Sequence, residues 1–182
     1  SFTIKIFYVV NNMKILNIIP FMLLLTLSAF GADLKVGDPA KLFKIQTQEN
    51  KTFDLASRKG MWTVLYFFPK AETPGCTKQA CSFRDNIKKI RAQKAEVFGI
   101  STNSVKDQAN FAKAHALTFL LLADDKGEVT NDYGAKMPIL NMSKRWTFII
   151  GPDLTILDIA KDVDPITDAQ RVATRISELQ KK

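Results

Sequence analysis

The chain has 182 residues, of which 26 are Lys or Arg, 18 are Asp or Glu and 46% are hydrophobic, and it has two cysteines and one histidine. This composition predicts an ordinary globular protein with one domain, and it excludes a disordered chain, a collagen and a disulfide-rich mini-protein. Two cysteines with one histidine cannot form a Cys₄ or Cys₂His₂ zinc site, so we expect no metal. The basic residues are scattered among acidic ones, which is typical of a solvated surface rather than of a nucleic-acid interface.

The first 31 residues have the layout of a secretory signal peptide. Lys14 provides a positive start, an uncharged and mostly apolar run follows it, and the small residues Ala29 and Gly31 suit cleavage before Ala32. We expect Met13 to be the true start, a signal peptide to end at Gly31, and the rest of the chain to be exported to the periplasm. An uncleaved membrane anchor is the alternative interpretation, and it leaves the folded part on the same side of the membrane.

Residues 32–182 contain no repeat, low-complexity tract or linker, and their apolar patterns alternate between those of strands and helices. Strands are predicted at residues 43–47, 52–55, 61–68, 97–101, 119–123, 146–150 and 155–159. Helices are predicted at residues 74–94, at 105–116 after a Ser104 cap, at 128–133 and from Thr167 onward. The first two strands form an N-terminal β-hairpin, and the element order predicts an α/β fold with a mixed central sheet flanked by helices.

The first cysteine lies just after the expected buried strand 61–68, at the start of a helix. Thr73 fits an N-cap and Pro74 fits the first helical position, which places Cys76 at the third. There the sulfur faces unpaired backbone N–H groups and the positive end of the helix dipole, and both favour a thiolate over a thiol. Cys76 is therefore a candidate nucleophile.

Cys81 lies five residues further along the same helix. Five helical residues advance about 7.5 Å and turn about 500°, which puts the two Cα atoms about 8.6 Å apart on different faces. A disulfide requires Cα atoms roughly 4.4–6.8 Å apart, so it can form only if the first turns of the helix unwind. This spacing favours a redox cycle with local unfolding over a static crosslink. Two unrelated thiols are the alternative, which is disfavoured in an exported protein.

A long run of residues around these cysteines resembles the peroxiredoxins, and in particular their bacterioferritin-comigratory-protein or peroxiredoxin Q branch. The resemblance extends from about Leu34 to Gln180. The residues that carry it are Tyr66-Phe67-Phe68-Pro69-Lys70-Ala71, Thr73-Pro74-Gly75-Cys76-Thr77, Cys81, Phe83-Arg84-Asp85, Gly99-Ile100-Ser101 and Arg145-Trp146-Thr147-Phe148-Ile149-Ile150. The resemblance implies a thioredoxin-like fold, a cofactor-free monomer, and thiol-dependent reduction of hydrogen peroxide and organic hydroperoxides.

The resemblance also implies a role for each site residue. Cys76 matches the peroxidatic cysteine and Cys81 the resolving one, while Thr73 and Arg145 match residues that hydrogen-bond the peroxide, and Pro69 matches one that shields the pocket from water. The implied partners are peroxide substrates and a thioredoxin-like dithiol reductant. Each assignment has a structural alternative, because Thr73 can act as a cap alone, Arg145 as a surface charge and Pro69 as a strand end.

Two further functions compete with the peroxidase interpretation. The first is an exported thiol–disulfide exchanger, and the second is a redox-regulated holdase that exposes Phe83 and Ile87 when the helix unwinds. The combination of Pro69, Thr73 and Arg145 favours the peroxidase, because an exchanger has no need of groups that bind peroxide oxygens. One departure from the branch is Gln79, which stands where many members carry Glu.

Overall fold

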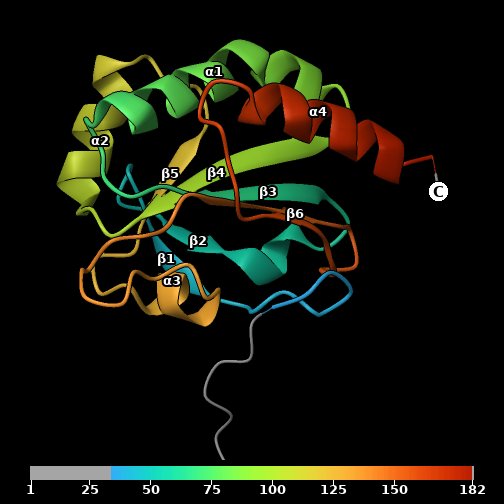
Figure 1. Ribbon diagram of the computed structural model, residues 1–182, viewed down its shortest axis with the longest axis horizontal. Coiled ribbons are helices and arrows are strands. Elements are labelled where there is room, and N and C mark those ends of the chain that lie inside the picture. The colour runs from blue at the N-terminus through green and yellow to red at the C-terminus, as the bar shows by residue number, and fades with distance from the viewer. Residues whose placement is uncertain (1–33, 182) are drawn as a thin grey trace, which may run out of the picture.

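The computed structural model describes residues 34–181, which form one seven-stranded mixed sheet with helices on both faces (Figure 1). The strands are β1 (Lys44–Thr47), β2 (Thr52–Asp54), β3 (Trp62–Phe67), β4 (Ala95–Ser101), β5 (Leu120–Ala123), β6 (Trp146–Ile150) and β7 (Ile156–Ala160). The helices are α1 (Pro74–Arg91), α2 (Val105–Ala114), α3 (Glu128–Asp132) and α4 (Asp168–Leu179), with a 3₁₀ turn at Leu55–Arg58. The predicted order of strands and helices is confirmed.

The sheet has the strand order β2-β1-β5-β4-β3-β6-β7. Strands β3, β4 and β5 are parallel, whereas β1, β2, β6 and β7 pair with their neighbours in antiparallel fashion. The predicted hairpin of β1 and β2 and the predicted mixed sheet are therefore confirmed. In this register Trp146 at the start of β6 pairs with Phe67 at the end of β3, which brings the residue before β6 beside the start of α1.

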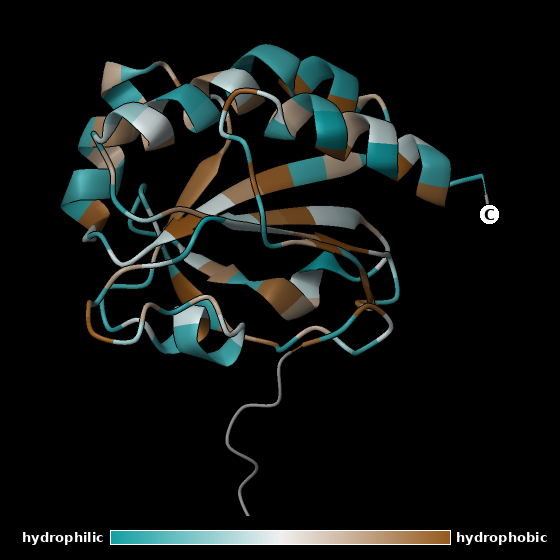
Figure 2. Cartoon of the chain, in the orientation of Figure 1, coloured by the Kyte–Doolittle hydropathy of each residue, from teal (hydrophilic) through white to brown (hydrophobic). Residues whose placement is uncertain are grey.

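Helices α1, α2 and α4 cover one face of the sheet, and α3 lies on the other (Figure 1). Strand β3 is apolar at nearly every position because both of its faces are buried. Its Val64 and Tyr66 belong to the core under α1 and α4, whereas its Leu65 and Phe67 belong to the core on the opposite face. The hydropathy colouring shows the apolar strands between helices whose outer faces are hydrophilic (Figure 2).

The ends of the helices differ in detail from the prediction. Helix α1 ends at Arg91 instead of residue 94, because the chain turns there and Lys94 adopts a positive φ of 58°. Ser104 forms the predicted cap of α2, in a capping box with Asp107. Thr73 occupies the N-cap position of α1, but its side chain does not cap the helix. Its hydroxyl instead donates to the Lys70 carbonyl oxygen at 2.9 Å.

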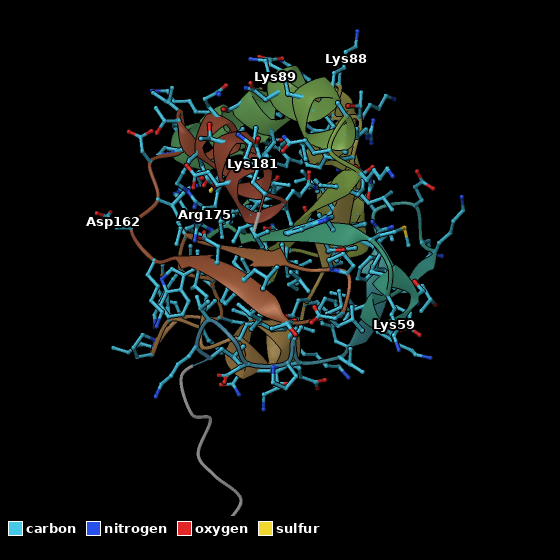
Figure 3. All side chains as sticks on the ribbon, turned by 90° about the vertical axis from the view of Figure 1, so that its right-hand side faces the viewer. Lys59, Lys88, Lys89, Asp162, Arg175 and Lys181 are labelled. Atoms are coloured by element: carbon cyan, nitrogen blue, oxygen red, sulfur yellow. The ribbon has the colours of Figure 1, made fainter. Side chains whose placement is uncertain are left out.

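The expected signal peptide at residues 1–31 lies outside the described residues. Within residues 34–181, none of the helices combines the length and the apolar character needed to cross a bilayer. Basic side chains are distributed over the surface of this part of the chain, and acidic ones stand among them (Figure 3). Arg175, for example, pairs with Asp158 at 3.0 Å and with Glu178 at 3.0 Å.

Candidate active site

Cys76 lies in the first turn of α1, immediately after the bend that follows β3. As predicted it is the third residue of the helix, after Pro74 and Gly75. Its side chain is almost completely buried, with 1% exposure, whereas Cys81 on the same helix is partly exposed. Both cysteines are free thiols. The site therefore holds one enclosed thiol with a second, more accessible thiol about one and a half turns away.

Arg145 is the one predicted site residue that comes from a distant part of the chain. It directly precedes β6, and the pairing of β6 with β3 brings it to the start of α1. Its Nη2 donates to the Cys76 sulfur at 3.5 Å. A guanidinium at this distance is attracted to negative charge on the sulfur, and so is the positive end of the helix dipole at the start of α1. The arrangement thus brings two sources of positive potential to one buried sulfur.

Gly75 makes this approach possible. A Cβ atom added at residue 75 would lie 3.1 Å from Arg145 Nη2, closer than most real Cβ contacts. The missing side chain therefore leaves room for the guanidinium over the first turn of the helix. In the sequence Pro74-Gly75-Cys76, the proline begins the helix, the glycine leaves space for the guanidinium of Arg145, and the cysteine provides the thiol.

The bend between β3 and α1 is fixed to the neighbouring strand. The backbone N–H of Phe68 donates to the Ile100 carbonyl oxygen at 3.0 Å, and the N–H of Ala71 donates to Asn103 Oδ1 at 3.0 Å. Pro69 is partly buried in this bend. Thr73 follows it, and since its hydroxyl hydrogen is used by Lys70, its oxygen remains an acceptor. The bend leads directly into the first turn of α1, which carries Cys76.

Tyr66 lies beneath the site and is fully buried. Its ring stacks on Phe83 of α1 with a centroid distance of 4.6 Å, and its hydroxyl has no hydrogen-bond partner in the described chain. Burial raises the pKa of the Tyr66 phenol well above its ordinary value, and negative charge on Cys76 raises it further. Tyr66 therefore stays neutral and contributes an apolar floor.

Gln79, which the sequence pattern did not place in the site, holds Arg145, and Asp168 in turn holds Gln79. Gln79 is completely buried, and its Oε1 accepts from Arg145 Nη1 at 2.6 Å. Its Nε2 donates to Asp168 Oδ2 at 2.9 Å. Gln79 lies one helical turn after Cys76, on the same helix. Its departure from the Glu that many members of the branch carry was therefore a signal in the sequence that residue 79 belongs to the site. Asp168 lies 89 residues further along the chain, and no local pattern connects it to the site.

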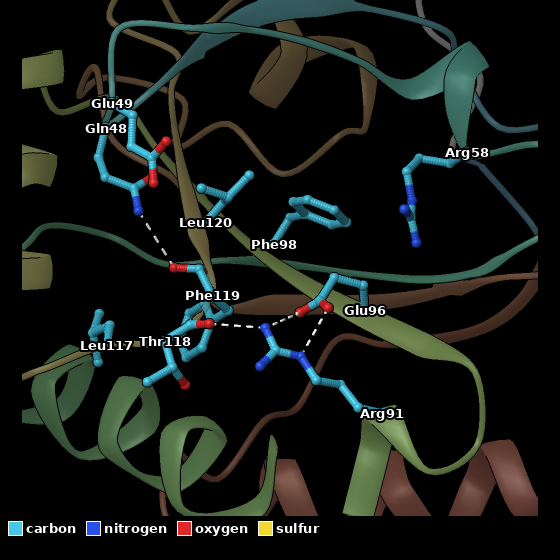
Figure 4. A pocket seen from close by; sticks show the side chains of 10 residues that line it. All are labelled: Gln48, Glu49, Arg58, Arg91, Glu96, Phe98, Leu117, Thr118, Phe119 and Leu120. Atoms are coloured by element: carbon cyan, nitrogen blue, oxygen red, sulfur yellow. Dashed lines mark hydrogen bonds and ion pairs between the residues drawn. The ribbon is translucent and has the colours of Figure 1, made fainter. Parts of the chain in front are cut away.

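The hollow drawn in Figure 4 is a different place. It has a volume of about 420 Å³ and lies at the amino ends of β4 and β5, where Arg91 pairs with Glu96. Cys76, Arg145 and Thr73 do not line it. Because the thiol lies at the carboxyl end of β3, this hollow does not serve the chemistry of Cys76.

The fold and the site together define a thioredoxin-like protein with a buried thiol, in contact with an arginine, at a helix N-terminus. The chain belongs to the AhpC/TSA family, whose model matches residues 36–159. It is 40% identical to the chloroplastic peroxiredoxin Q of Triticum aestivum over 109 residues, which are 59% of this chain and 50% of that protein. It is 38% identical to a putative peroxiredoxin of Mycobacterium tuberculosis over 131 residues, which are 69% of this chain and 84% of that protein.

Solved structures agree with these relatives. The crystal structure of the peroxidoxin BcpB from Mycobacterium tuberculosis matches with a TM-score of 0.75 and 33% identity, over 80% of this chain and 98% of that one. The predicted thioredoxin-like fold and the resemblance to the peroxiredoxin Q branch are therefore confirmed. The chain spans only about half the length of the plant relatives, 50% of the wheat protein and 56% of the poplar one.

The relatives correct the predicted location. The plant relatives are named as chloroplastic proteins, which is not a periplasmic location. The expectation of an exported protein is therefore wrong. It rested on the apolar run in the first 31 residues, and such a run reflects composition alone and does not identify a destination.

Proposed function

We propose that this protein is a thiol-dependent peroxidase that reduces hydrogen peroxide and organic hydroperoxides. The observation that carries the proposal is the contact between Arg145 Nη2 and the Cys76 sulfur at 3.5 Å, on the first turn of α1. A fixed cation at the sulfur stabilises the attacking thiolate, and the same guanidinium can donate to a peroxide oxygen as negative charge develops on it. Membership of the AhpC/TSA family supports the same chemistry.

The first step joins sulfur to oxygen. The Cys76 thiolate attacks one peroxide oxygen, the S–O bond forms, the O–O bond breaks, and the departing oxygen takes a proton and leaves as water or an alcohol. Cys76 is oxidised to a sulfenic acid. Thr73 Oγ1 acts as an acceptor for the peroxide O–H, because its own hydrogen is already donated to Lys70. Arg145 donates, Thr73 accepts and Pro69 limits water, so the three residues orient one small substrate.

The second step uses Cys81. Its thiolate attacks the sulfur of the Cys76 sulfenic acid, a disulfide forms, and the hydroxyl leaves as water. Both cysteines belong to α1, where the Cα spacing of about 8.6 Å is too long for a disulfide, so the first turns must unwind. An external dithiol of the thioredoxin type then reduces the disulfide. We expect the protein to act as a monomer without a cofactor.

The holdase alternative has less support. It requires that unwinding expose Phe83 and Ile87, but these residues are 0% and 6% exposed and form part of the core that α1 shares with the sheet. The exchanger alternative leaves the contact between Arg145 and Cys76 without a purpose, because disulfide exchange involves no peroxide oxygen.

Rapid mixing of the pre-reduced protein with hydrogen peroxide tests the proposal. Wild type, Cys76→Ser and Cys81→Ser are compared by peroxide consumption and by intact mass of the product. We expect fast loss of one peroxide with a Cys76–Cys81 disulfide in wild type, a sulfenic acid in Cys81→Ser, and no reaction in Cys76→Ser. Equally slow reaction of all three proteins would rule out the peroxidase and direct attention to disulfide exchange.

A further inference from the structure

Asp168 is a buried carboxylate that the proposed chemistry does not use. It is the first residue of α4 and only 2% exposed. Its Oδ2 accepts from Gln79 Nε2 at 2.9 Å and from the Thr147 hydroxyl at 2.7 Å, and its Oδ1 accepts from Arg171 Nε at 3.2 Å. Burying a charge is costly unless it is paired and hydrogen-bonded, and the three donors meet this requirement. What needs an explanation is why the chain keeps a carboxylate buried at this place.

The Gln79 amide joins this carboxylate to the active site. The two ends of an amide differ, because the oxygen only accepts and the nitrogen only donates. Since Nε2 donates to Asp168 at 2.9 Å, Oε1 is turned toward Arg145, from which it accepts at 2.6 Å. Asp168 therefore determines which end of the amide Arg145 meets.

The guanidinium of Arg145 is held at two points. Its Nη1 donates to Gln79 and its Nη2 donates to the Cys76 sulfur. A planar group with one nitrogen fixed has little freedom to move the other away. The chain of contacts thus runs from α4 through α1 to the sulfur, by way of three side chains.

We propose that Asp168 is a positioning residue, which through Gln79 fixes the guanidinium of Arg145 beside Cys76. The inference rests on the proposed peroxidase function. It also explains why residue 79 is an amide in this chain, since a carboxylate there would face a second buried carboxylate at residue 168. Like charges in such a place repel strongly.

The contact between Gln79 and Asp168 joins an amide to a carboxylate, so it can be tested by exchanging the two groups between the two residues. In Gln79→Glu two carboxylates meet, and in Asp168→Asn the amide at residue 79 loses its charged acceptor. In the double variant Gln79→Glu/Asp168→Asn, the new amide donates to the new carboxylate, which still accepts from Arg145. The remaining contacts survive, since the amide introduced at residue 168 keeps an oxygen for Arg171, and the Thr147 hydroxyl can accept as well as donate.

The experiment measures the second-order rate constant for hydrogen peroxide with pre-reduced protein, the rate of Cys76 alkylation by iodoacetamide, and the melting temperature. We expect each single variant to lose about tenfold or more in the peroxide rate constant, and the double variant to recover to within about threefold of wild type. If the single variants fold too poorly to assay, the double variant still decides: a double variant that folds and reacts like wild type supports the pairing.

A matched control separates positioning from the stability of α4. Asp158 also anchors α4, through Arg171 at 2.8 Å and Arg175 at 3.0 Å, and it does not touch Gln79. Asp158→Asn should lower the melting temperature and leave the peroxide rate constant of the folded protein unchanged. If Asp168→Asn behaves in the same way, or if the double variant does not recover, the inference is overturned.

Failure of the inference can be distinguished from failure of the proposed function. A wild type that reacts rapidly at Cys76, with variants that react equally fast, contradicts only the role of Asp168. A wild type that does not consume peroxide contradicts the peroxidase itself. In that case the alkylation rate of Cys76 still reports the position of Arg145, and equal alkylation rates in all variants would overturn the inference independently.

Discussion

Two arginines at opposite ends of the sheet differ in the groups that their guanidinium groups contact, and this difference separates a structural arginine from one placed for chemistry. Arg91, near the amino end of β4, forms two hydrogen bonds of 2.9 Å with the Glu96 carboxylate (Figure 4). Its hydrogen bond with Glu96 raises the pKa of the Arg91 guanidinium, and its positive charge is matched by a negative one. Arg145, at the carboxyl end of β3, meets the neutral Gln79 amide instead. Its charge is therefore left for the Cys76 sulfur at 3.5 Å.

Arg91 is held and neutralised by a single residue, Glu96. Arg145 is held instead by the Gln79 side chain, and Asp168 holds that side chain from one layer further away. Arg91 has a structural role, whereas the placement of Arg145 suits it for chemistry.

The largest expected effect comes from removing the charge beside the sulfur. Arg145→Gln should lower the second-order rate constant for hydrogen peroxide by about 10²–10³-fold, as loss of a preorganised donor does elsewhere. Arg145→Lys should recover only part of this loss, since a lysine cannot contact Gln79 and Cys76 with one planar group. Stopped-flow kinetics on pre-reduced protein gives both values. A lysine variant as fast as wild type would mean that charge alone matters and that orientation does not.

A smaller effect is expected when the guanidinium is displaced without being removed. Gly75→Ala adds a Cβ atom 3.1 Å from Arg145 Nη2, so the guanidinium must shift by a few tenths of an ångström. We expect the peroxide rate constant to fall about fivefold, because small displacements of reacting groups are costly. Stability should not fall, since alanine is the better helix former by about 1 kcal/mol. Thermal melts beside the kinetics check this, and an unchanged rate would show that the close approach has no role.

The smallest effect is expected at the other arginine. Glu96→Gln removes the charge from a pair whose side chains are 43% and 28% exposed. Pairs this exposed contribute about 0–1 kcal/mol, so the free energy of unfolding should change little. The peroxide rate constant should stay within about twofold of wild type, because the pair lies at the opposite end of the sheet. A loss approaching that of Arg145→Gln would contradict the distinction between the two arginines.

Much of the fold follows from the sequence because the apolar patterns of this chain are regular. The continuous apolar run of β3 predicts a strand buried on both faces, and Ser104 with Asp107 predicts the start of α2. The place of Cys76 in the helix follows from Thr73 and Pro74. These features depend on neighbours within a few residues, which a sequence pattern records directly.

The missed features depend on contacts that no local pattern records. The Thr73 hydroxyl has two possible partners, the helix N–H groups and the Lys70 carbonyl, and only the shape of the bend decides between them. Gln79 and Asp168 lie 89 residues apart and meet because α1 and α4 pack side by side. A buried polar network is specified by geometry in three dimensions, so its members look like ordinary surface residues in the sequence.

We propose that the guanidinium of Arg145, fixed beside the sulfur, makes Cys76 selective for peroxide. This claim is tested most directly by the ratio of two rate constants, one for hydrogen peroxide and one for iodoacetamide, in wild type and in Arg145→Gln. Alkylation needs a thiolate but no donor to a peroxide oxygen, so we predict that the variant loses at least about a hundredfold in the peroxide rate and less than about tenfold in the alkylation rate. Equal losses in both rates, or no loss in either, would contradict the claim.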